Sequence, residues 1–177
     1  MKILPKLAVV LTGLTLSVAA IYAKTDEAAH QYSEFHVGSL VSGPAVGDTK
    51  GKAVLIDAWG THCGPCLALL PEVEKISKRY KDKMVVIGAE CQGSSNDQIN
   101  DVVKKNHLTY SITSGMQGPV QFSGLPHVFV FDTTGKLLYT GSPFEKEFEH
   151  ALHRAVAAGG SSSASNDSGF STAFPGH

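Results

Sequence analysis

The chain has 177 residues, enough for one domain with a sizeable core and too few for two comfortable ones. Its 15 Lys and Arg residues nearly balance 16 Asp and Glu residues, so its overall charge indicates neither nucleic-acid binding nor an acidic substrate. No repeat with a period of about 20 to 50 residues is present, which excludes repeat architectures.

The first 23 residues have the order of a secretory signal peptide. Lys2 and Lys6 precede an uncharged run over residues 7–23, which ends in small residues. An uncleaved anchor is the alternative, because the run is only slightly shorter than the roughly 20 residues that span a bilayer. Both alternatives predict an exported protein, periplasmic or otherwise extracytoplasmic, that contacts the membrane only if the segment is retained. Residues 24–33 are then a linker.

The folded body is predicted to span residues 34–158. Residues 52–59 read KAVLIDAW, a short apolar run with β-branched residues that is typical of a buried strand. Residues 83–90, KMVVIGAE, predict a second strand of the same kind. Between them, residues 65–80 place apolar side chains on one face of a helix, namely Leu69, Leu70, Val73, Ile76 and Tyr80.

Three further elements follow. Ser95 and Gln98 form a capping-box pattern at the start of a helix over residues 95–106. Residues 127–141, HVFVFDTTGKLLYTG, predict a strand, a tight turn and a strand. A last helix stops before Gly159, and its apolar stripe is Phe144, Phe148, Ala151, Leu152, Ala155 and Val156.

Strands that alternate with helices predict an α/β domain with helices on both faces of the sheet. The first strand–helix–strand unit carries Cys63 and Cys66 at the carboxyl end of its first strand, where open α/β sheets place their chemistry. Residues 159–177 are rich in Gly and Ser and carry little apolar surface, which predicts a disordered tail.

The two cysteines have three candidate uses. Structural zinc needs four ligands, usually in two pairs, whereas the chain has one Cys-x-x-Cys and a lone Cys91, so no metal is predicted. A structural disulfide suits an exported protein. However, a bridge that closes so short a loop removes little entropy from the unfolded chain.

A redox function, the third use, explains more of the local sequence. The thiolate is the species that attacks a disulfide, so the nucleophile needs a lowered pKa and access to solvent. Cys63, at the amino end of the predicted helix, meets both needs, because the helix dipole and free N–H groups favour an anion there. Pro65 suits the first turn of that helix. Cys63 would form a mixed disulfide with the target, and Cys66, one turn deeper, would resolve it.

Asp57 interrupts the first apolar strand, six residues before Cys63. A carboxyl group buried there has a raised pKa, which would make it a proton acceptor for Cys66 near neutral pH. A solvated Asp57 at the strand end would have no such role. The local pattern alone leaves both alternatives open.

The motif WGTHCGPC, with Asp57 upstream, Pro71 downstream and GLPHVFVFD further along, resembles the thioredoxin fold. Within that fold it is similar to the exported TlpA/ResA-like thiol–disulfide oxidoreductases, over about residues 35–158. The resemblance implies a central mixed β-sheet flanked by helices, with an extra helix and strand inserted within residues 90–122. It also implies that Pro71 kinks its helix and that Asp57 is the proton acceptor.

The same resemblance implies a substrate-binding loop at Leu125 and Pro126, with a cis peptide bond before the proline. Further residues that tune the active site are implied to be Trp59, His62, Gly64 and Pro65. His62 replaces the Trp that thioredoxins often have. Leu69 stands where related proteins often have a glutamate, so that Asp57 is left as the acceptor.

The Gly-Pro dipeptide between the cysteines implies a reductant that needs no cofactor. Its partners would be disulfide-bearing exported proteins, such as apocytochromes c before haem attachment, and a membrane electron donor that reduces it again. The direction of electron flow depends on the reduction potential, which the surroundings of the cysteines also set.

Two other functions remain as alternatives. A peroxiredoxin-type peroxidase has Thr three residues before its cysteine, whereas Thr61 is two before Cys63, and an assay of hydrogen peroxide consumption separates the two. A copper chaperone of similar fold combines two cysteines with a distant histidine, for which His127 is the candidate. Copper titration of the reduced protein and its Cys63→Ser variant tests that function. Cys91 is interpreted as a buried free thiol.

Overall fold

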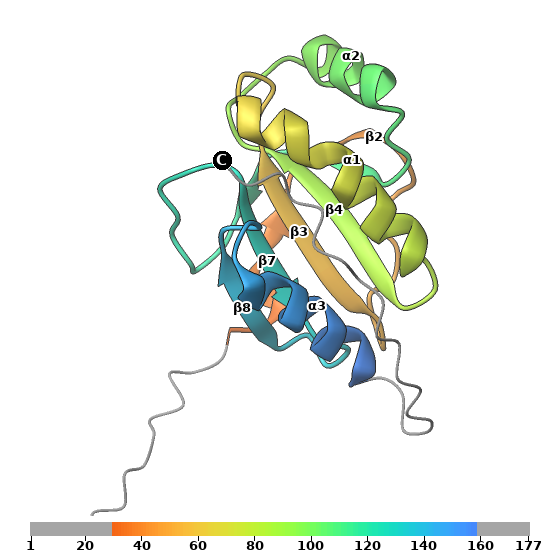
Figure 1. Cartoon of the computed structure of the whole chain (residues 1–177). Helices are drawn as coiled ribbons and strands as arrows, with labels where there is room; N and C mark the ends of the chain where they lie inside the picture. Colours follow the sequence, from red (N-terminus) through yellow and green to blue (C-terminus); the bar gives the residue numbers. More distant parts are fainter. Residues whose placement is uncertain (1–29, 159–177) are drawn as a thin grey trace, which may run out of the picture.

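The computed structural model describes residues 30–158, which form a six-stranded β-sheet with three α-helices (Figure 1). The predicted signal peptide (1–23), most of the predicted linker (24–33) and the predicted tail (159–177) lie outside these residues. Within residues 30–158, no helix combines the length and apolar character needed to cross a membrane.

The centre of the fold is a strand–helix–strand unit made of β3 (Ala53–Trp59), α1 (Gly64–Arg79) and β4 (Met84–Glu90). All three elements are within one residue of their predicted bounds. β3 and β4 are parallel, and every residue of β3 is buried, which accounts for its nearly continuous apolar sequence. Pro71 lies inside α1 without ending it, although its ring nitrogen cannot donate to the carbonyl one turn earlier.

The segment after β4 forms the predicted extra helix and strand. It consists of α2 (Asn96–Asn106), β5 (Ser111–Ser114) and the short β6 (Met116–Gln117). The capping box at the start of α2 is confirmed, because Ser95 N–H donates to the Gln98 side chain at 2.9 Å and Gln98 N–H donates to Ser95 Oγ at 3.3 Å. β5 pairs parallel with β4 and so extends the sheet.

The C-terminal part of the domain consists of β7 (His127–Phe131), β8 (Leu137–Gly141) and α3 (Lys146–Ala157). β7 pairs antiparallel with β8, as the hairpin pattern predicts, and it also pairs antiparallel with β3. The assignment of Phe144 to the apolar stripe of the last helix is wrong. A turn precedes α3, with Glu145 N–H donating to the Ser142 carbonyl, and it leaves Phe144 51% exposed.

Three elements near the N-terminus of the described region were not predicted. They are the 3-10 turn η1 (Tyr32–Glu34), β1 (His36–Val37) and β2 (Leu40–Ser42). β1 pairs with β6, and β2 forms one edge of the main sheet beside β5. Tyr32 N–H donates to the Gly135 carbonyl at 2.7 Å, so the end of the predicted linker packs against the folded body.

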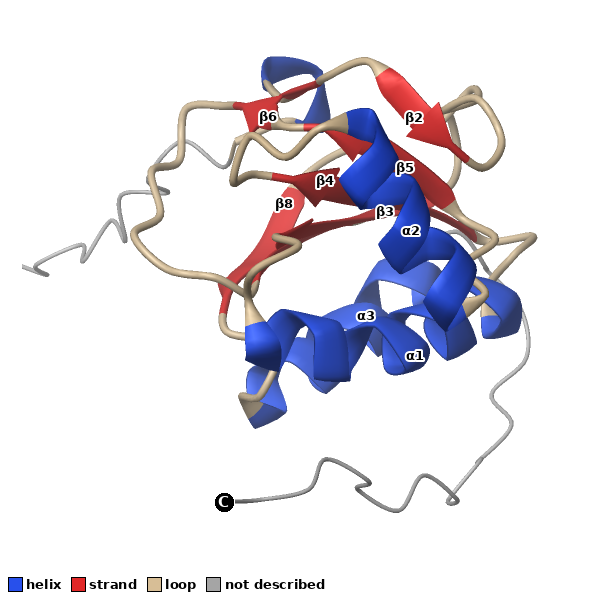
Figure 2. Ribbon diagram, turned by 90° about the horizontal axis from the view of Figure 1, so that it is seen from above, coloured by secondary structure: helices blue, strands red, loops and turns tan. Residues whose placement is uncertain are grey.

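The main sheet is mixed and has the strand order β2-β5-β4-β3-β7-β8. α1, α2 and α3 pack on one face, and the N-terminal segment with part of the 116–122 loop covers the other (Figure 2). The expectation of helices on both faces is therefore wrong for the described residues. Phe35 fills the place of a helix, because its ring packs against Phe129 and Phe131 with centroids 5.3 and 4.9 Å apart.

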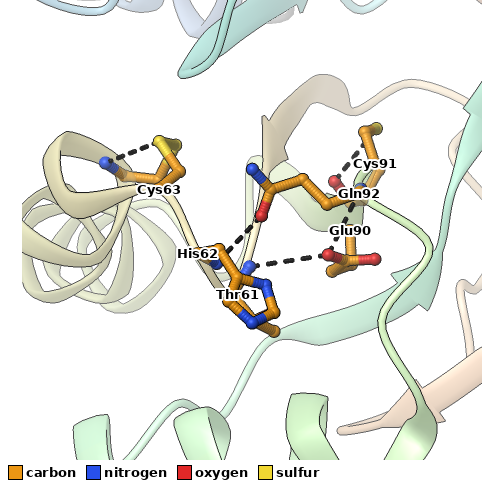
Figure 3. Close-up of a disulfide and its surroundings, with 8 residues drawn as sticks. Thr61, His62, Cys63, Glu90, Cys91 and Gln92 are labelled. Atoms are coloured by element: carbon orange, nitrogen blue, oxygen red, sulfur yellow. Dashed lines mark hydrogen bonds between the residues drawn. A yellow bond between two sulfur atoms is a disulfide. The ribbon is translucent and has the colours of Figure 1, made fainter.

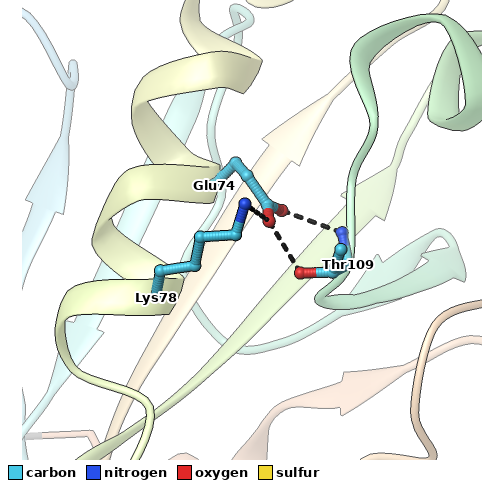
Figure 4. Close-up of polar contacts among 3 residues, drawn as sticks. All are labelled: Glu74, Lys78 and Thr109. Carbon is cyan, nitrogen blue, oxygen red and sulfur yellow. Dashed lines mark hydrogen bonds and ion pairs between the residues drawn. The ribbon is translucent and has the colours of Figure 1, made fainter.

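A buried carboxylate fastens the inserted segment to α1 (Figure 4). Glu74 accepts hydrogen bonds from Thr109 N–H at 2.8 Å and Thr109 Oγ1 at 2.6 Å, and it pairs with Lys78 Nζ at 3.0 Å. Burial alone would raise the pKa of Glu74, but the bonds from Thr109 and Lys78 outweigh it and lower that pKa. Glu74 therefore holds the chain just after α2 against α1.

Replacement of Glu74 by Ala is expected to lower the free energy of unfolding by about 1–3 kcal/mol at pH 7, because it leaves the Thr109 donors without a partner. The matched control is Glu72→Ala, which removes only an ion pair with the exposed Lys75 and should cost about 1 kcal/mol or less. Denaturant unfolding of both variants measures the difference. Equal losses would contradict the clamping role.

The stabilising effect of Glu74 should also depend on pH in a defined direction. Because its pKa is lower in the folded chain than the ordinary 4.5, the effect is complete above that value and is lost as the pH falls through the folded pKa. The stability gap between wild type and Glu74→Ala should therefore narrow in acid. A gap that widens as the pH falls would contradict the assignment.

Candidate active site

Cys63 and Cys66 form a disulfide at the start of α1. Cys63 is the N-cap residue, and its sulfur accepts a hydrogen bond from Cys66 N–H at 3.2 Å. Cys63 is 9% exposed and Cys66 is 1% exposed, so an incoming group reaches Cys63 first. Gly64 and Pro65 form the first turn between them, where the missing N–H of Pro65 leaves no helical hydrogen bond unmade. In the reduced form, the free N–H groups of this turn would stabilise a Cys63 thiolate.

Asp57 lies in the middle of β3 and is 1% exposed, so the solvated alternative does not apply. Neither carboxyl oxygen has a hydrogen-bond partner among the described residues. Burial raises the pKa of Asp57 from its ordinary 3.8 to about 7. Asp57 and Cys66 belong to the helix-covered side of the sheet, so this carboxyl can exchange a proton near neutral pH on the side where the deeper sulfur lies.

Another buried carboxylate, Glu90, ends β4 and organises the loops beside Cys63 (Figure 3). Ser94 donates to it twice, from N–H at 3.0 Å and from Oγ at 2.8 Å. Gln92 N–H donates at 3.2 Å and Thr61 N–H at 3.5 Å. Thr61 Oγ1 also lies 2.6 Å from Ser94 Oγ, so the residues before Cys63 are connected to the loop that follows β4.

His62 is exposed, and its ring is held by Thr61 rather than by a cysteine. Its Nδ1 lies 3.0 Å from Thr61 Oγ1, and its backbone N–H donates to Gln92 Oε1 at 2.9 Å. Figure 3 shows the imidazole directed away from the Cys63 sulfur. The structure thus shows no contact through which His62 would act directly on that sulfur.

A groove of about 870 Å³ opens beside Cys63, with walls formed by residues 90–94, 114–118 and 120–125. Gly, Ser and Gln dominate these walls, and Glu90 is the only charged residue among the described residues that line them. Leu125 contributes to the groove, and the peptide bond from Leu125 to Pro126 is cis. The predicted substrate loop therefore borders the same groove as the outer cysteine.

A second groove of about 680 Å³ shares residues 121–125 with the first. It runs from Pro65 past Pro126 to His127, whose ring stacks on Phe122 with centroids 4.8 Å apart. His127 Nε2 lies 2.8 Å from Thr140 Oγ1, and burial lowers the pKa of His127. Within residues 30–158, no three His, Cys, Asp or Glu side chains are grouped so that they could hold a metal ion.

Cys91 is a free, half-buried thiol that lines the first groove together with Cys63. Its Sγ donates to the Ala89 carbonyl at 3.3 Å, and in Figure 3 the side chain of Gln92 lies between the two cysteines. Burial, and then the charges of Glu90 and Asp57, raise the pKa of Cys91 to about 11. Only a small fraction of Cys91 is ionised at neutral pH, so Cys91 is a poor nucleophile.

Other predicted residues lie around the cysteines as follows. Trp59 is the last residue of β3 and is fully buried, and its carbonyl accepts from Cys91 N–H at 2.8 Å. Leu69 is buried in the core on α1, so no acidic side chain takes the place that related proteins give to glutamate.

Glu90 and Gln92 were not predicted. A charged residue at the end of the apolar run KMVVIGAE was the available signal for Glu90, whereas nothing local marks Gln92.

Comparisons of sequence connect the chain to known proteins. A family model described as Redoxin matches residues 45–156. The chain is 30% identical over 112 residues to the thioredoxin-like protein YneN of Bacillus subtilis (strain 168), covering 59% of this chain and 66% of that protein. It is 32% identical over 95 residues to a thiol-disulfide oxidoreductase ResA of Bacillus cereus, covering 51% and 55%. The matches thus span between half and two thirds of these relatives.

Solved structures show the same fold at lower identity. A thiol-disulfide isomerase from Corynebacterium glutamicum has a TM-score of 0.63 at 16% identity, covering 73% of this chain and 97% of that one. A DsbF homologue from Corynebacterium diphtheriae has a TM-score of 0.60 at 22% identity, covering 71% and 84%. The predicted thioredoxin-like α/β fold is confirmed.

Proposed function

The chain belongs to the Redoxin family, and from that premise we propose that it is a thiol–disulfide oxidoreductase that cycles Cys63 and Cys66 between dithiol and disulfide. The observation that supports this most directly is the pairing of the two sulfurs at the start of α1, with the outer sulfur beside an open groove. The similarity to proteins named thiol-disulfide oxidoreductase supports the same conclusion.

In the first step the Cys63 thiolate attacks one sulfur of a client disulfide. A bond forms between Cys63 and that sulfur, the client S–S bond breaks, and the other client sulfur leaves with the electron pair and takes up a proton. The free N–H groups at the start of α1 favour the attacking anion. The client segment would occupy the groove between Cys63 and Leu125.

In the second step Cys66 loses its proton to Asp57 and attacks the Cys63 sulfur. The mixed disulfide breaks, the second client sulfur leaves with the electron pair and takes up a proton, and Cys63 and Cys66 become the disulfide observed here. Two electrons have then passed to the client. The buried position and raised pKa of Asp57 support its role as the acceptor.

The clients we propose are disulfide-bearing exported proteins, with apocytochromes c as one class, and a membrane electron donor would return the protein to its dithiol form. The resemblance to exported TlpA/ResA-like proteins and the signal-like order of residues 1–23 support an extracytoplasmic location. The small, uncharged side chains of the groove suit an extended polypeptide that is recognised mainly through its backbone.

The reduction potential tests the proposed direction. Equilibration of the full chain with glutathione buffers, followed by thiol alkylation and mass spectrometry, is expected to give a value near about −270 mV, the range of disulfide reductants. Cys91→Ser is the background for this measurement, because it leaves only the two relevant cysteines. A value near about −120 mV would reverse the direction and make the protein an oxidant.

A further inference from the structure

Four buried polar atoms in the described part of the chain have no hydrogen-bond partner, and three of them belong to residues of β3. They are the two carboxyl oxygens of Asp57 and Nε1 of Trp59, and the fourth is the hydroxyl of Tyr110. All three residues are at most 3% exposed. Buried polar atoms are rarely left unpaired, so a group of them in one region points to a ligand that satisfies them together.

Trp59 and Tyr110 meet over Gly88, the residue of β4 that pairs with Asp57. Asp57 and Trp59 are two residues apart on β3 and therefore point to the same face of the sheet. Gly88 of β4 pairs with Asp57 in register. A Cβ added at Gly88 would lie 2.8 Å from Cδ1 of Ile112, 3.0 Å from Cε2 of Tyr110 and 3.2 Å from Nε1 of Trp59. The tyrosine ring and the indole nitrogen thus lie directly beside the neighbour of Asp57.

Tyr110 reaches this position from the inserted segment. It follows Thr109, which Glu74 of α1 holds by two hydrogen bonds (Figure 4). The charges of Asp57 and Glu74 add to burial in raising the pKa of Tyr110 well above its ordinary value. The hydroxyl therefore keeps its proton at every physiological pH and is available as a donor.

The chemistry of the group is complementary. The indole N–H is a donor only, the Tyr110 hydroxyl can donate, and the Asp57 carboxylate accepts. No direct bond joins these groups, so a single mediator that satisfied all three would accept from two of them and donate to the third. Water has this valence, and internal waters typically make about three such bonds.

We propose that Trp59 and Tyr110 donate to one internal water molecule, that this water donates to the Asp57 carboxylate, and that Tyr110 is thereby a positioning residue for Asp57. The arrangement makes the inserted segment part of the proton-transfer machinery, because it alone supplies Tyr110. The catalytic consequence rests on the proposed function. The presence of the water and the pKa of Asp57 are independent of that function, since both can be measured without a client.

Titration of Asp57 in the oxidised full chain provides the first test. The carboxyl carbon of Asp57 is followed by NMR as the pH changes, with Asp57→Asn to assign the signal. Cys63 and Cys66 do not titrate in this form, and Cys91 titrates near pH 11. Other acidic groups near the cluster are Glu74 on α1 and Glu90 on β4. Val128 of β7, which pairs with Asp57, is apolar, as is the packed face of α3.

Tyr110→Phe is expected to move the Asp57 midpoint upward by about half a pH unit or more, because the water loses a donor that orients it toward the carboxylate. Tyr139→Phe is the matched control, since the Tyr139 hydroxyl donates to Ser142 and Glu145 instead. The Asp57 midpoint in this variant should equal that of wild type. An unchanged midpoint in Tyr110→Phe would overturn the positioning role.

The water itself is tested in the unmodified protein. Magnetisation transfer from a long-lived internal water to the Trp59 indole proton is expected in wild type and in Tyr139→Phe, and should be weaker in Tyr110→Phe. Trp59 is the chain's single tryptophan, so the indole signal needs no further assignment. Absence of this transfer in wild type would overturn the proposal whether or not the variants fold. If wild type shows the water signal but no disulfide reductase activity, the proposed function is refuted and the internal water is not.

Discussion

A Cys66→Ser variant will capture a client disulfide and fail to release it, whereas Cys63→Ser will capture nothing. Cys63 is the more exposed sulfur and the N-cap of α1, so it makes the first bond. Cys66 is needed only to break that bond. Both variants should lose turnover by at least about 10³-fold, the scale on which enzymes lose rate without a reacting residue.

Turnover is measured by the reduction of a peptide disulfide with an excess thiol donor, and the trapped complex is measured by non-reducing mass spectrometry. Cys91→Ser is the matched control, because Cys91 lines the same groove as Cys63. The raised pKa of the Cys91 thiol makes it unreactive. It should keep wild-type turnover within about twofold, as expected for a residue outside the chemistry. Trapping by Cys63→Ser, or loss of turnover in Cys91→Ser, would contradict the assigned order of attack.

Asp57→Asn is expected to stabilise the protein while it slows the reaction. In the folded chain Asp57 keeps its proton up to about pH 7, whereas in the unfolded chain it ionises near 3.8. The burial of Asp57 therefore leaves the stability of the fold unchanged below about pH 3.8. Above that pH it lowers the stability increasingly, and the loss levels off above about pH 7. A shift of this size corresponds to about 4 kcal/mol at high pH. Asn has no charge to bury and avoids this cost.

Denaturant unfolding at several pH values checks the stability effect. The variant should exceed wild type by about 2–4 kcal/mol at pH 8, by less at pH 5, and by little below pH 4. Glu74→Ala supplies a contrast in sign, because its difference from wild type also grows with pH but is a loss of stability rather than a gain. A variant that is less stable than wild type at pH 8 would show that the carboxylate has partners that compensate its burial.

The same variant isolates the second chemical step. Without a proton acceptor, attack by Cys66 on the mixed disulfide should slow by about 10²–10⁴-fold near pH 7, the usual contribution of general-base catalysis. Capture of the client by Cys63 should change far less. Rapid mixing with acid quench resolves the two steps. Equal slowing of both steps would contradict the assignment of Asp57 to Cys66.

Local sequence patterns were sufficient for the elements whose signals are local. The buried strands β3 and β4, the capping box of α2 and the β7–β8 hairpin match their predictions because periodicity, caps and turns are written within a few consecutive residues. The short strands β1, β2 and β6 have two or three residues each, too few to show a period. Their existence depends on pairing with distant segments.

The predicted site divides in the same way. The positions of Cys63, Cys66 and Asp57 follow from a motif and from one charge in an apolar run. Tyr110 could not be assigned to the site, because its proximity to Asp57 arises only when β5 pairs with β4 and Glu74 fixes Thr109. Phe144 was misassigned for a related reason. Its spacing fits the helical stripe, but the turn before α3 depends on tertiary structure.

The hydrogen bonds that Glu90 accepts have a consequence for the rate at which a donor can reduce the disulfide. They connect Thr61, just before Cys63, with Ser94 beyond β4, so the backbone approaching the sulfurs is braced on two sides. We therefore expect the backbone beside the sulfurs to move little when the disulfide opens or closes. The oxidised and reduced forms should superimpose closely. The rate of reduction by a donor should then be limited by diffusional encounter rather than by a rearrangement of the fold.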